Sequence, residues 1–78
     1  MSRFDGMYEW EIEELEHELV LYENNIAVKR TYHQGLAAAY AAAEKEHGEL
    51  QWEGFSHTRQ RTAFVPGVED SYIAVQPA

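Results

Sequence analysis

The sequence predicts a mainly α-helical protein in which a helical hairpin, or one long bent helix of the coiled-coil type, precedes a C-terminal extended arm or β-hairpin. Residues 7–50 contain no proline, and glycine occurs there only at positions 35 and 48. Apolar residues recur within that stretch at alternating steps of four and three, which is the spacing of one helical face. After Gly54 the chain changes to turn dipeptides and extended runs. We therefore expect a helical oligomerisation region in residues 1–54 and an extended arm or β-hairpin in residues 55–78.

The first predicted helix carries an apolar stripe with heptad spacing. Its members are Tyr8, Ile12, Leu15, Leu19, Tyr22 and Ile26. Seven glutamates between residues 9 and 23 flank the stripe, which is typical of the solvated face of an associating helix. The stripe continues at Leu36 and Tyr40, but Lys29 and His33 interrupt it because they are poor core residues.

Two helical arrangements fit this interruption. A single helix over residues 7–50 would be about 65 Å long at 1.5 Å per residue and would need a coiled-coil partner. Alternatively, the chain breaks near Lys29 and folds into a hairpin, which we favour because Thr31 and Gln34 have the spacing of a capping box. A chain of 78 residues buries a small fraction of its surface. Self-association is therefore predicted in both arrangements.

The second predicted helix is rich in alanine. Ala37–Ala39 and Ala41–Ala43 lie on either side of Tyr40. Alanine has the highest helix propensity of any residue, and its small side chain lets another helix approach closely. The segment is therefore predicted to be a packing surface.

The C-terminal region is predicted to be extended. Arg59–Val65 and Ser71–Val75 read as two extended segments that flank the turn dipeptide Pro66-Gly67. An isolated β-hairpin is marginal in water, so the arm should lie against a neighbouring chain. Large aromatic residues dominate such contacts. The predicted interface residues are therefore the apolar stripes named above together with Trp52, Phe55, Phe64, Tyr72 and Ile73.

The charge and composition of the chain restrict its partners. It has 14 acidic and 6 basic residues and a formal net charge of −8, so it should repel nucleic-acid phosphates and anionic membranes. The absence of cysteine excludes disulfides and thiolate metal sites. The N-terminal segment lacks the apolar core of a signal peptide, and no run is long enough to span a bilayer. We expect a cytoplasmic or virion-associated protein that is not secreted and whose partners are proteins.

Catalytic patterns are missing as well. The chain has no cysteine nucleophile, no phosphate-binding glycine loop and no serine with a recognisable elbow and orienting acid. We therefore expect a non-enzymatic protein without catalytic residues and without a cofactor.

One motif suggests a metal site. Glu44 and His47 have the Glu-x-x-His spacing that places a carboxylate and an imidazole on one helical face, as carboxylate-bridged metal sites require. Glu14 precedes Glu44 by 30 residues, so a turn near residue 29 would bring the two level. In these residues, over positions 13–50, the chain resembles the encapsulated ferritins, which are half-ferritin helical hairpins. The resemblance implies an iron-oxidising site between two subunits, with Glu14, Glu44 and His47 as iron ligands.

Three functions follow from these observations. The leading hypothesis is a structural or assembly protein, a small acidic helical subunit that self-associates and docks its arm onto neighbours in a larger particle such as a phage capsid or tail. One alternative is the ferritin-like metal-binding protein. The other is an acidic inhibitor whose glutamate-rich helix binds a basic nucleic-acid-binding host protein.

Overall fold

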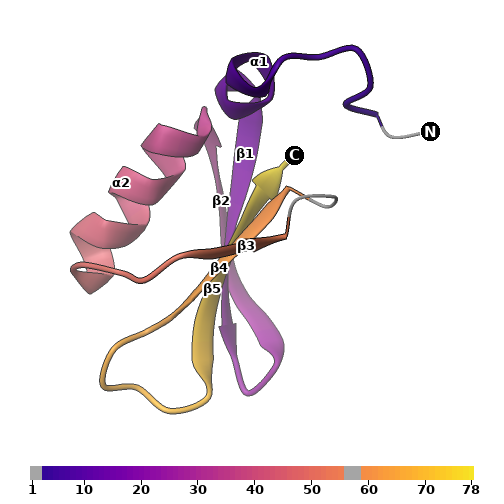
Figure 1. Ribbon diagram of the computed structural model, residues 1–78. Helices are drawn as coiled ribbons and strands as arrows, with labels where there is room; N and C mark the ends of the chain where they lie inside the picture. The colour runs from indigo at the N-terminus through magenta and orange to yellow at the C-terminus, as the bar shows by residue number, and fades with distance from the viewer. Residues whose placement is uncertain (1–2, 56–58) are drawn as a thin grey trace.

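The protein is a two-layer structure of one antiparallel sheet and two helices. The computed structural model describes residues 3–55 and 59–78, and for Phe55 only the backbone. The sheet has the strand order β2-β1-β5-β4-β3. Figure 1 shows α2 beside the sheet and α1 at the end of the sheet where β1 begins. In chain order the elements are α1 (Glu9–Glu14), β1 (Glu16–Glu23), β2 (Ile26–Gln34), α2 (Leu36–His47), β3 (Glu53–Phe55), β4 (Gln60–Phe64) and β5 (Ser71–Pro77).

The prediction of a mainly α-helical protein, whether a helical hairpin or a long coiled-coil helix, is wrong. The strands β1 and β2 occupy residues 16–34, where the heptad spacing predicts helix. The helix α1 has 6 residues and α2 has 12, so neither provides a coiled-coil seam. Within the described ranges, neither helix has the length and apolar character needed to cross a membrane. The helical hairpin implied by the resemblance to the encapsulated ferritins is not formed.

The strand β1 explains this error. β1 pairs with a strand on each side and buries residues on both faces, because Leu19 and Leu21 pack against the core while Val20, which points to the other face, is 2% exposed. Asn24 and Asn25 join β1 to β2 with positive φ angles of 52° and 64°. Asparagine tolerates this conformation, which a two-residue β-hairpin turn needs at both positions. The turn and the pairing of β1 with both β2 and β5 therefore outweigh the high helix propensity of the glutamates.

The helix α2 lies against the sheet through its smallest side chains. Ala39 and Ala43 are fully buried, and Leu36 joins them in a cluster with Ile73 and Val75 of β5. Because an alanine side chain ends at Cβ, the helix axis can come close to the strands. This close contact is thus made with the sheet of the same chain.

The C-terminal segments form β4 and β5, which pair with each other. β5 also pairs antiparallel with β1, where Leu19 is opposite Val75 and Leu21 is opposite Ile73. β5 is therefore at the centre of the sheet, between β1 and β4. Of the two predicted alternatives, the segment forms a β-hairpin built into the sheet, with β5 as its buried strand, and not an arm that extends from the fold.

The face of the sheet opposite α2 carries a row of aromatic rings. Tyr22 and Tyr72 stack with their centroids 4.8 Å apart, and Phe64 meets Tyr72 edge-on at 6.4 Å. Phe64 is 79% exposed. The Phe64 end of this face is therefore open, whereas Val20 and Ala74 on the same face are buried.

Candidate functional site

The predicted metal ligands lie on two different helices, Glu14 on α1 and both Glu44 and His47 in the last turns of α2. Glu14 is exposed at the end of α1. The Glu44 carboxylate accepts a hydrogen bond from the Leu50 backbone N–H at 3.2 Å, and His47 Nε2 lies 3.9 Å from a carboxylate oxygen of Glu46. Among the described residues, no group of three or more histidine, aspartate or glutamate side chains could hold a metal ion. The strands β1 and β2 separate α1 from α2 in the sequence, so Glu14 and Glu44 do not face each other across a helical turn.

The predicted interface residues fall into three groups by burial. Whether any of them contacts another chain stays a prediction, and the side chain of Phe55 lies outside the described residues. The buried members are Ile12, Leu36 and Ile73, the half-buried members are Leu15, Leu19, Tyr22, Tyr40, Trp52 and Tyr72, and the exposed members are Tyr8, Ile26 and Phe64.

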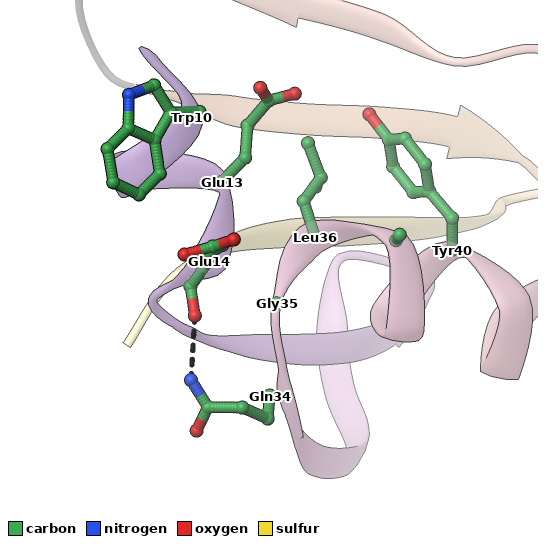
Figure 2. A pocket seen from close by; sticks show the side chains of 8 residues that line it. Trp10, Glu13, Glu14, Gln34, Gly35, Leu36 and Tyr40 are labelled. Carbon is green, nitrogen blue, oxygen red and sulfur yellow. Dashed lines mark hydrogen bonds between the residues drawn. The ribbon is translucent and has the colours of Figure 1, made fainter. Parts of the chain in front are cut away.

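A cavity of about 680 Å³ lies between α1 and the first turns of α2, and we call it the α1–α2 cavity. Figure 2 shows Trp10 on one side and Tyr40 on the other, with Glu13, Glu14 and Leu36 between them. The cavity thus combines two aromatic walls with two carboxylates. Its lining residues are Trp10, Glu13, Glu14, Gln34, Gly35, Leu36, Ala37 and Tyr40.

Hydrogen bonds tie α1 to the start of α2 and fix the shape of the cavity. The Gly35 N–H donates to the Leu15 carbonyl oxygen at 3.1 Å, and Gln34 Nε2 donates to the Glu14 carbonyl oxygen at 2.7 Å (Figure 2). Gly35 has φ 96° and ψ 152°, which is close to a region of backbone conformation that is essentially restricted to glycine. A Cβ at this position would lie 3.4 Å from the Glu13 carbonyl oxygen. Glycine is therefore needed for the backbone conformation of the turn into α2, where a side chain would also contact α1.

The ring of Tyr40, which forms one wall of the cavity, is held in place by Trp52. The Tyr40 ring stacks on Trp52 at 4.4 Å, with 26° between the ring planes. Burial raises the pKa of the Tyr40 phenol above its ordinary value of 10.0; Arg61 opposes this through its charge and a hydrogen bond, whereas Glu13 and Glu44 raise the pKa further. Tyr40 therefore presents a fixed, neutral ring at neutral pH.

The two carboxylates of the α1–α2 cavity differ from other glutamates of the chain. Arg59 pairs with Glu9, and Lys29 pairs with Glu46 at 3.2 Å. In the part of the chain that the structure describes, no cation forms an ion pair with Glu13 or Glu14, and both residues are exposed. The α1–α2 cavity is therefore a site of uncompensated negative charge.

Sequence reasoning singled out Glu14, Leu36 and Tyr40, but it assigned them to a metal site and to helical interfaces. It did not find the cavity, because Glu13 and Gly35 come together only when the hairpin β1–β2 returns the chain to the end of α1. The one local signal is a glycine directly before an alanine-rich helix. Comparison with known protein families, with curated proteins and with solved structures found no match.

Proposed function

We propose that this chain is a non-enzymatic binding protein whose α1–α2 cavity receives a cationic side chain from a basic partner protein. The observation that supports the proposal is the pair of carboxylates without an ion-pair partner among the described residues, Glu13 and Glu14, in a cavity walled by Trp10 and Tyr40. The proposal is closest in class to the acidic inhibitor that the sequence suggests as an alternative.

Each part of the cavity suits a long basic side chain. The carboxylates attract the charge, and an aromatic face attracts a cation through its negative quadrupole. Leu36 and the rings offer apolar surface to the methylene stem of lysine or arginine, which such residues bury while the charged end stays polar. The net charge of −8 adds long-range attraction, which accelerates encounter with a basic partner.

The double variant Glu13→Gln/Glu14→Gln tests the proposal. We expect its affinity for a capped peptide rich in lysine and arginine, measured by isothermal titration calorimetry, to fall by roughly two- to thirty-fold, because each exposed ion pair contributes about 0.2–1 kcal/mol. The affinity of the unmodified protein should also fall as salt is added.

A matched control removes the same charge from the opposite end of the sheet. Glu23 ends β1, and Glu69 lies between β4 and β5; both are exposed and away from the cavity. The variant Glu23→Gln/Glu69→Gln should keep most of the affinity. An equal loss of peptide affinity in both double variants would show that net charge alone attracts the peptide. An undetectable affinity of the unmodified protein for the peptide would contradict the proposal directly.

Self-association is a second candidate function, and the exposed aromatic row favours it. The charge of Glu18 on the same face is compensated within the chain, because Arg30 lies 3.8 Å from its carboxylate and Gln76 Nε2 donates to it at 2.5 Å. A second copy could therefore cover Phe64 without meeting an unpaired charge at Glu18. Sedimentation equilibrium is expected to show a dimer that Phe64→Ser converts to monomer; a monomeric unmodified protein would rule the interface out.

A further inference from the structure

Trp10 presents an open ring to the α1–α2 cavity. It is 60% exposed, whereas Ile12, two residues further along α1, is 4% exposed. Among the described residues, Trp10 has no aromatic or cationic neighbour in ring contact. Figure 2 shows the Glu13 side chain between the rings of Trp10 and Tyr40. A flat cationic group that enters there can meet a ring and a carboxylate at the same time.

Glu13 is next to a site that already binds a guanidinium. Glu9 and Glu13 are one helical turn apart and therefore neighbours on α1, and Arg59 pairs with Glu9. In the same region, the positive charge of Arg61 acts on the Tyr40 phenol and lowers its pKa. The surroundings of the cavity thus accommodate guanidinium groups against both a carboxylate of α1 and the aromatic wall of α2.

We infer that the side chain bound in the α1–α2 cavity is an arginine rather than a lysine, stacked on Trp10 with its guanidinium directed to Glu13; this rests on the proposed function. The guanidinium is planar, is less strongly hydrated than an ammonium group, and presents a fork of donors that matches a carboxylate. Tryptophan is the best aromatic partner for such a cation. Lysine can supply the charge but neither the fork nor the planar stacking.

Four capped peptides that differ only in one central residue test the inference. The central residues are arginine, lysine, citrulline, which keeps the planar shape without the charge, and norleucine. Binding is followed by NMR titration through the Trp10 indole N–H signal and the backbone N–H signal of Gly35. We expect the arginine peptide to bind about two- to ten-fold more tightly than the lysine peptide, the range that corresponds to one additional hydrogen bond, because both cations can lie on the ring but only the guanidinium adds the second donor. The citrulline and norleucine peptides should cause no saturable shift.

The variant Trp10→Leu separates stacking from charge, because leucine keeps apolar bulk on α1 without a ring. Its backbone N–H signals should show weaker binding of both peptides and a smaller arginine preference, because the paired hydrogen bonds to Glu13 remain while the stacking is lost. The control Tyr8→Leu removes an exposed ring that does not line the cavity, and it should keep the arginine preference.

The outcomes distinguish the inference from the proposed function. Equal affinity of the unmodified protein for arginine and lysine overturns the inference and leaves the proposed function standing. An arginine preference that is undiminished in Trp10→Leu also overturns the inference. The inference and the proposed function are both overturned if neither basic peptide binds. They are also both overturned if the citrulline peptide binds as tightly as the arginine peptide.

Discussion

Replacing Ile73 with alanine should destabilise the protein by about 2–5 kcal/mol, the loss that follows when a large aliphatic side chain is removed from a packed core. Ile73 is 1% exposed and lies on the central strand β5, between Leu21 of β1 and Ala63 of β4. Domains of ordinary stability unfold with only about 5–15 kcal/mol, so this single change would remove a large part of the margin. Urea unfolding followed by circular dichroism measures the difference.

Ile26→Ala is the matched control for this variant. Ile26 is the same residue type, but it begins the edge strand β2 and is 65% exposed, so the loss should stay within about 0.5 kcal/mol. The heptad interpretation predicts the larger loss of stability for Ile26→Ala, because it places Ile26 in the helical seam and Ile73 in an arm outside that seam. A larger effect at Ile26 than at Ile73 would therefore contradict the sheet and favour the seam.

Gly35→Ala should destabilise the protein by about 1–3 kcal/mol and also weaken peptide binding. The φ of 96° and ψ of 152° at Gly35 are strained for any residue with a side chain. The new Cβ would lie 3.4 Å from the Glu13 carbonyl oxygen, which is an ordinary contact distance, so the change at the cavity comes from relief of the strained backbone at Gly35, which lines it. Denaturant unfolding measures the first effect, and calorimetry with the basic peptide measures the second.

Gly48→Ala serves as the control for Gly35→Ala. Gly48 also has a positive φ, 82°, but a Cβ there would meet no atom within 4 Å, so the substitution introduces strain without a close contact. It should reduce stability without changing the affinity for the peptide. If Gly35→Ala left peptide binding unchanged, the backbone conformation of Gly35 would not be what shapes the cavity.

The sequence predicts local structure well where propensity and tertiary context agree. The alanine-rich segment of α2 is helical, and the two segments around Pro66-Gly67 are the strands β4 and β5. Prediction fails at residues 16–34, where Leu19 fits both a heptad and a strand alternation. Whether this segment forms a strand or a helix depends on residues distant in the sequence, since Leu19 is opposite Val75 in the sheet. A pattern within one segment does not contain that information.

The candidate site is less predictable than the fold for the same reason. Glu14 and Tyr40 stand out in the sequence, but their shared cavity depends on the backbone of Gly35 and on its hydrogen bond to Leu15. Among the described residues Glu13 has no ion pair, whereas Arg59 pairs with Glu9, one turn earlier on α1. The cavity and the ion pairing on α1 both depend on contacts between residues far apart in the chain, so the spacing of residues in the sequence does not reveal them.

The nuclear Overhauser spectrum of the free protein tests the central claim most directly, namely that β1 and β2 form a hairpin inside one sheet and bring Gly35 against the end of α1. The structure predicts contacts from Leu19 to both Thr31 and Val75, its cross-strand partners, and between Gly35 and Leu15. Contacts between residues three apart that continue as a helix through residues 16–34, without these cross-strand contacts, would contradict it.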